Sequence, residues 1–258
     1  MFLYALSVIL SLWYPLSVLV QVMSSRSWDM KRMRSRHSFY RYFLILEVLI
    51  IWLMPLGYEY PLIIGGSKLF LAGYSLATIH KTTMIKKGVQ LLYFLGSLVF
   101  IVELLWFLSD LGFLDFIFHG FLFTHAPSFS LIRFFLWFLF FGILLLRWIK
   151  SLMREPLVTN SVVMGAGAGY LLLGFIGGVL LNTLYSFQPS AFIGLPDNPT
   201  AVLDVASFGY LTTLGSSVVN DDVVLGQVGA LTISLAGQLY VAILIALVLG
   251  KFHQRRGR

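Results

Sequence analysis

Long runs of apolar residues, separated by short polar segments, dominate the chain. A helix needs about 20 mostly apolar residues to cross a bilayer. Seven runs meet this requirement, and they cover residues 3–22, 39–57, 61–79, 88–108, 128–149, 157–184 and 224–250. A further apolar stretch, 201–214, is too short to cross and suits a re-entrant segment. The pattern therefore predicts an all-α integral membrane protein with seven transmembrane helices plus a re-entrant helix.

The composition agrees with this pattern and removes several classes of protein. Of the 258 residues, 59% are hydrophobic and only 11% are charged, whereas a soluble domain carries about 25% charged residues. Too few polar side chains remain to cover a soluble core. This excludes a soluble enzyme, a disordered protein and a nucleic-acid-binding domain. The chain has no cysteine, which excludes disulfides and thiolate sites. We expect no enzymatic activity, no cofactor and a lipid bilayer as partner.

Positive charge is confined to alternate loops. Of the 18 Lys and Arg residues, 16 fall in four segments, at 26–41, 81–87, 147–154 and 251–258. Because cytoplasmic loops carry an excess of Lys and Arg, these four segments are predicted to lie in the cytoplasm. The N-terminus is then outside and the C-terminus inside. No charged segment precedes 3–22 and no clear cleavage site follows it, so a retained helix is favoured over the alternative, a signal peptide.

Four ionisable residues fall inside predicted spans, one on each of four successive helices: Glu47, Lys68, Glu103 and Arg133. Charges in hydrocarbon are costly and normally pair with one another or face water. We expect one bundle with Glu–Lys or Glu–Arg pairs inside it. The alternative is a proton or voltage pathway. Steep voltage sensing needs several cations on one helix. The span that contains Arg133 has no further Lys or Arg before Arg147.

The segment 155–250 carries the functional signal. It reads as a helix, a short loop, the apolar stretch 201–214, the letters TTLGSS and a last helix. A half-span helix that breaks into extended backbone is tolerated at membrane depth only where that backbone lines a cavity. An ion pathway uses such backbone by pointing carbonyl oxygens at the ion.

The same segment resembles the pore module of potassium channels, especially the small bacterial ion-channel family with two pore helices. Ser207, Phe208 and Leu211, followed by TTLG at 212–215, are similar to the family's filter pattern S-F-x-x-L-T-T-L-G-Y-G-D. The last helix reads GQLYVAILIALVLG from Gly237 to Gly250 and resembles the family's G-Q-L-Y-L-A-x-L-I-A-x-L-V-G.

The resemblance implies a homotetramer with one central pore in a bacterial inner (plasma) membrane. The selectivity filter would be Thr212, Thr213, Leu214, Gly215, Ser216 and Ser217, with a permeating K⁺ or Na⁺ between the subunits. Asp221 and Asp222 would form charged rings at the outer mouth, unless they belong to a solvated turn. Gly237 would be an inner-helix hinge, unless it serves close helix packing.

With this resemblance the chain divides into four parts. Residues 1–22 form an extra N-terminal transmembrane helix, and 23–154 form a four-helix membrane bundle at the position of a voltage sensor, with few gating charges. Residues 155–250 form the pore domain, and 251–258 form a basic cytoplasmic tail.

The filter departs from the family at its outer half. Ser216, Ser217 and Val218 stand where the family has Y-G-D. The second glycine of the family filter is left-handed, and a residue with a Cβ loses about 1–2 kcal/mol there. We expect the carbonyl layers at Thr213 and Leu214 to survive and the outer layers to change.

The sequence therefore predicts a cation channel with an altered, weakly selective filter. The alternative is a non-conducting structural or accessory membrane protein on a channel scaffold. A small transporter or lipid-modifying enzyme using Glu47, Glu103 and Arg133 is a third reading, and the pore signature argues against it.

Overall fold

The computed structural model describes residues 38–82, 89–112, 127–154, 159–196 and 198–256. In these ranges six helices are long and apolar enough to cross a membrane: Ser38–Tyr58, Leu62–Ile79, Val89–Ser109, Pro127–Met153, Asn160–Phe187 and Val224–Ala246. They match six of the seven predicted spans to within a few residues. The seventh, 3–22, lies outside the described residues. Continuous helices are the expected form, because backbone groups in hydrocarbon must be satisfied within their own segment.

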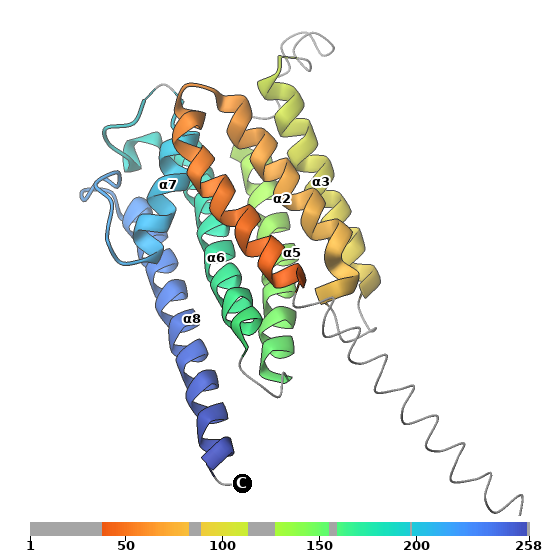
Figure 1. Cartoon of the computed structure of the whole chain (residues 1–258). Helices are drawn as coiled ribbons and strands as arrows, with labels where there is room; N and C mark the ends of the chain where they lie inside the picture. The colour runs from red at the N-terminus through yellow and green to blue at the C-terminus, as the bar shows by residue number, and fades with distance from the viewer. Residues whose placement is uncertain (1–37, 83–88, 113–126, 155–158, 197, 257–258) are drawn as a thin grey trace, which may run out of the picture.

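Figure 1 shows the order of the elements, from red at the described N-terminal end to blue at the C-terminal end. The first described helix covers 38–53 and ends in a 3₁₀ turn, η1 (Met54–Tyr58). The elements that follow are α2 (Pro61–Thr82), α3 (Val89–Asp110), α5 (Pro127–Arg154), α6 (Asn160–Phe187), η2 (Pro189–Ala191), α7 (Thr200–Leu211) and α8 (Val224–Arg256).

The first helix, α2, α3 and α5 pack together, and we call them the bundle. Its best-packed part is an aromatic cluster in which Tyr40 stacks on Trp148 with 5.4 Å between ring centroids. Phe39 contacts both Trp148 and Tyr74, so that the first helix, α2 and α5 meet at one point. α3 packs against α2 and α5. The bundle therefore has a core of large side chains that every one of its helices helps to enclose.

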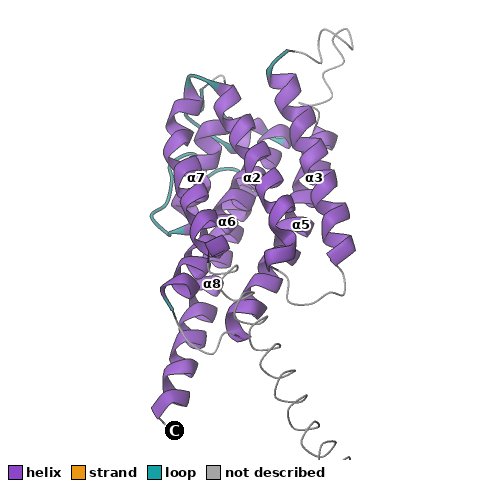
Figure 2. Cartoon of the chain, turned by 45° about the vertical axis from the view of Figure 1, so that its right-hand side comes forward, coloured by secondary structure: helices purple, strands orange, loops and turns teal. Residues whose placement is uncertain are grey.

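α6 joins the bundle to the rest of the molecule. It packs against α5 on one side and against α7 and α8 on the other. We call α6, η2, α7, the following segment to residue 223, and α8 the C-terminal module. α8 and α3 lie at opposite edges of the molecule (Figures 1 and 2).

α7 is the short apolar helix within the stretch 201–214, and it has 12 residues where α6 has 28. Its re-entrant placement in a membrane stays a prediction. At its C-terminal end the Leu211 carbonyl accepts a hydrogen bond from Tyr170 Oη, 2.9 Å away, in the middle of α6. The chain then returns toward the end of α6. There the Ile193 N–H donates to Val218 O at 2.8 Å, and the Asn220 N–H donates to Ala191 O at 2.9 Å.

Candidate functional site

The loop 212–217 directly follows α7. Residues 212–215 and Ser217 are exposed, with Leu214 at 87%, and Ser216 is half-buried. The six predicted filter residues thus lie together in one largely exposed loop between the end of α7 and the start of α8.

The left-handed residues of the loop do not lie where the family pattern has its second glycine, at Ser217. Among the described residues, Thr213 is the only non-glycine residue with a positive φ, at 61°, and Gly215 follows at 78°. Ser217 therefore does not adopt the left-handed conformation of the family's glycine, and the strained position lies four residues earlier. A left-handed residue with a Cβ costs roughly 1–2 kcal/mol.

Several hydrogen bonds tie the loop to α7 and to the rest of the chain. The Gly215 N–H donates to Gly209 O at 3.2 Å, and Tyr210 Oη donates to Ser216 O at 2.8 Å. At the base of the loop, Ser234 Oγ of α8 donates to Tyr210 O at 2.8 Å. Tyr210 was not among the predicted site residues. It lies in the apolar stretch before the predicted filter, and the spacing alone does not show that its hydroxyl turns back to the Ser216 carbonyl.

Asp221 and Asp222 lie in an exposed turn beyond the loop. The Asp222 N–H donates to Asn220 Oδ1 at 3.0 Å, and Gln227 Nε2 donates to Asp221 O at 2.7 Å. These bonds are those of a solvated turn, as the alternative interpretation proposed. A ring of carboxylates at an outer mouth stays a prediction, since it requires further subunits.

Gly237 lies where α8 crosses the end of α7. A Cβ there would come within 2.6 Å of Leu211 O and 2.9 Å of Leu211 Cδ1. Close packing is therefore one role of this glycine. Its role as a hinge stays a prediction.

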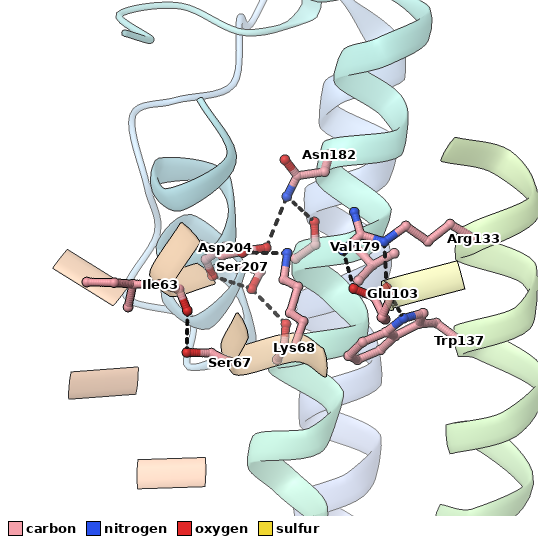
Figure 3. A network of polar contacts seen from close by, with 12 residues as sticks. Ile63, Ser67, Lys68, Glu103, Arg133, Trp137, Val179, Asn182, Asp204 and Ser207 are labelled. Carbon is pink, nitrogen blue, oxygen red and sulfur yellow. Dashed lines mark hydrogen bonds and ion pairs between the residues drawn. The ribbon is translucent and has the colours of Figure 1, made fainter. Parts of the chain in front are cut away.

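The buried pair Glu103–Arg133 confirms the prediction of a Glu–Arg pair inside the bundle (Figure 3). Arg133 Nε lies 2.6 Å from Glu103 Oε1, and Nη2 lies 2.8 Å from Oε2. Trp137 Nε1 donates to the same Oε1 at 2.6 Å. The Arg133 guanidinium also stacks over Trp106, 4.2 Å from the ring centroid. Bidentate geometry and ring stacking are contacts that arginine makes and lysine does not.

Lys68, in contrast, pairs with an acid outside the bundle. Its Nζ lies 2.6 Å from Asp204 Oδ2 on α7, and both side chains are 2% exposed. Asn182 Nδ2 of α6 donates to the other oxygen, Oδ1, at 3.0 Å (Figure 3). Of the two expected kinds of pair, the structure therefore forms the Glu–Arg pair, and Lys68 pairs with an aspartate instead of a glutamate. Asp204 was missed, although an acidic residue inside the apolar stretch 201–214 is the same signal that identified the other four.

Glu47 takes part in neither pair. Its side chain is fully buried in the bundle, and neither carboxylate oxygen has a hydrogen-bond partner among the described residues. The two ion pairs therefore form a polar region that does not include Glu47, and no chain of polar contacts connects the four predicted charges.

An apolar groove of about 740 Å³ lies between η1, α7 and the loop. Met54, Pro55 and Tyr58 line one side, and Val205 and Leu214 belong to the other. The groove places the end of the first described helix beside the candidate filter.

Comparisons with known protein families, curated proteins and solved structures found no match to this chain. Function is therefore inferred from the loop, the two ion pairs and the resemblance quoted above. Among the described residues, no three His, Asp or Glu side chains gather as a metal site requires.

Proposed function

We propose that the chain is one subunit of a tetrameric, potassium-channel-like cation channel whose pore is lined by the 212–217 loop. The observation that carries this proposal is the exposure of residues 212–215 at the end of the short helix α7, which packs among helices of membrane length. An unsatisfied backbone group in hydrocarbon costs several kcal/mol, so this loop needs protein and water around it. Four copies around an axis supply both, with carbonyl oxygens facing an aqueous pathway.

The outer face of α8 supports association of several subunits. One face of this helix, with Ile233 and Tyr240, is buried against α6 and α7. The opposite face exposes large apolar side chains at helical spacing: Val224, Val228, Leu231, Leu235 and Leu239. In a tetramer, neighbouring subunits would cover part of this face and of the groove beside η1.

A cation is the favoured ion because of the direction of α7. Its C-terminal end, at Leu211, leads straight into the loop. The C-terminus of a helix carries a partial negative charge, which favours a cation nearby. The carbonyls of Thr213 and Leu214 are the proposed ligands, whereas the Ser216 carbonyl already accepts a hydrogen bond from Tyr210. Fewer carbonyl layers imply weaker discrimination between K⁺ and Na⁺.

The second candidate function is a non-conducting structural or accessory membrane protein on the same scaffold. The Tyr210–Ser216 hydrogen bond favours it, because this bond turns an outer carbonyl into the subunit. Both candidates share a proposed location in a bacterial inner membrane, with the N-terminus outside and the basic tail in the cytoplasm. The positive-inside rule supports that orientation.

Purified full-length protein in a planar bilayer, under gradients of KCl and NaCl, tests the proposal. We expect four-fold particles in mild detergent and cation currents with little preference for K⁺. The variant Ser216→Tyr/Ser217→Gly should shift the reversal potential toward K⁺, because it returns the family residues to the outer filter.

Other outcomes separate the candidates. Four-fold particles without current in either form would favour the non-conducting scaffold. A monomer, or a chloride-selective current, would overturn the channel proposal. Ile101→Ala, on the exposed side of α3 at the edge opposite to α8, is a control that should leave the reversal potential unchanged.

A further inference from the structure

Three helices converge on the carboxylate of Asp204, in the second turn of α7 (Figure 3). Lys68 of α2 pairs with Oδ2, and Asn182 of α6 donates to Oδ1. Asn182 Nδ2 also lies 2.8 Å from Gly178 O, which fixes the amide on α6. One side chain of the re-entrant helix is thus held both by its own module and by the bundle.

α7 has no room to slide on α6 at this point. A Cβ at Gly178 would meet Asp204 Oδ1 and come within 3.2 Å of Asp204 Cα. One turn further along, a Cβ at Gly174 would meet the ring of Phe208, and Ser207 Oγ lies 2.7 Å from Gly174 O. Packed contacts of this kind transmit displacements instead of absorbing them.

The C-terminal end of α7 passes such a displacement on to the loop. The Gly209 carbonyl accepts a hydrogen bond from the Gly215 N–H, and the Tyr210 hydroxyl donates one to the Ser216 carbonyl. A Cβ at Gly209 would come within 2.7 Å of Gly215 O, so the loop lies directly against the helix. An axial shift or rotation of α7 would therefore move the backbone of 212–217.

Stability alone does not require a charged pair at this site. Replacing a buried ion pair by apolar side chains of similar volume is often neutral or stabilising. The Lys68–Asp204 pair provides a directional contact, which an apolar pair would not. This contact joins α2 and α7, which otherwise have few contacts with each other.

We propose that Lys68 and Asp204 are positioning residues through which the bundle sets the conformation of the 212–217 loop and so regulates permeation there. This inference rests on the proposed function only in taking that loop as the pore lining. α2 carries the cation, so a movement of the bundle would reach the loop through α7.

The absence of cysteine allows a direct test that needs no current. In full-length protein, Leu214→Cys places one thiol on the loop, and its rate of reaction with a small cationic thiol reagent reports the loop's conformation. The test variant is Lys68→Met/Asp204→Asn, which removes both charges and leaves neither uncompensated. The matched control is Glu103→Gln/Arg133→Met, which removes the other buried pair. Val228→Cys on α8 controls for general changes in reactivity.

We expect Lys68→Met/Asp204→Asn to change the Leu214→Cys rate about tenfold, the population shift that corresponds to a loss of about 1.4 kcal/mol when the ion pair is removed. The rate of Val228→Cys should stay constant. The single variant Lys68→Arg keeps the positive charge, so its Leu214→Cys rate should stay near that of the parent. An unchanged rate in particles of parental size would overturn the inference, as would an equal change in the Glu103→Gln/Arg133→Met control.

Two further outcomes keep this inference separate from the proposed function. If the parent protein does not conduct, the labelling rates still decide whether Lys68 and Asp204 position the loop. If it conducts and the rates do not change, only the positioning inference fails. Should Lys68→Met/Asp204→Asn not assemble, Asn182→Ala, which removes the α6 donor to the same carboxylate, takes its place under the same criteria.

Discussion

In the bundle, Arg133 finds its counter-charge on Glu103 of the neighbouring helix α3, with two hydrogen bonds and two tryptophans around it. In the C-terminal module, Asp204 depends on Lys68, which belongs to the bundle. The same contrast holds for the backbone, since the bundle consists of continuous helices whereas the module exposes residues 212–215. The Glu103–Arg133 pair is thus complete within the bundle, whereas the Lys68–Asp204 pair joins the bundle to the module. In our proposal the module also needs further copies of itself.

The largest expected effect comes from breaking the pair inside the bundle. Arg133→Leu leaves Glu103 buried without its cation, which should destabilise the protein by about 3–5 kcal/mol. The midpoint of thermal unfolding in detergent measures this. Glu103→Gln/Arg133→Met should recover most of the loss, because no charge remains unpaired. A midpoint for Arg133→Leu equal to that of the parent would show that the pair is not buried as described.

A smaller effect is expected from glycines in the two regions. Gly178→Ala should cost about 1–3 kcal/mol, because its methyl group would push Asp204 and α7 away from α6. Gly142→Ala in α5 is the matched control. A Cβ there meets nothing within 4 Å, so alanine should gain up to about 1 kcal/mol from its higher helix propensity. Equal thermal midpoints for the two variants would contradict the close packing of α7 on α6.

The smallest effect should come from the loop. Thr213→Gly removes the left-handed strain but adds freedom to the unfolded chain, so a net gain of about 0.5–1 kcal/mol is expected. Thr212→Gly is the control. Its φ is −86°, and its hydroxyl lies 2.9 Å from Phe208 O, so glycine should destabilise there. A loss of stability in Thr213→Gly would mean that the assembled protein holds Thr213 in another conformation.

The long helices could be predicted from the sequence. In hydrocarbon every backbone N–H and C=O needs a hydrogen-bond partner, and a continuous helix is one of the few structures that supply it. Length also identified α7, since a 12-residue apolar helix cannot cross a bilayer. A buried Glu–Arg pair could also be predicted, although not which residues form it, because charges on neighbouring helices of one bundle have few other partners.

The contacts between the bundle and the module could not be predicted in the same way. Which acid Lys68 meets depends on how α2 and α7 cross, and the apolar pattern does not encode that crossing. The left-handed residue of the loop could not be placed from the family pattern for a similar reason. The hydrogen bonds of Tyr210 and Gly209 set the path of the loop, so the position of the family's glycine was a poor guide to Thr213.

The pairing of Lys68 with Asp204 also has a consequence for biosynthesis. A ribosome makes α3, α5 and α6 after Lys68 and before Asp204. If α2 enters the bilayer before α7 is made, it carries an unmatched cation, whereas Glu103 and Arg133 are only 30 residues apart in the chain. Until α7 is made, Lys68 has to stay near water, lipid phosphate or a protein partner such as an insertase. Newly made chains that end before α7 should therefore be held longer by that machinery than full-length chains.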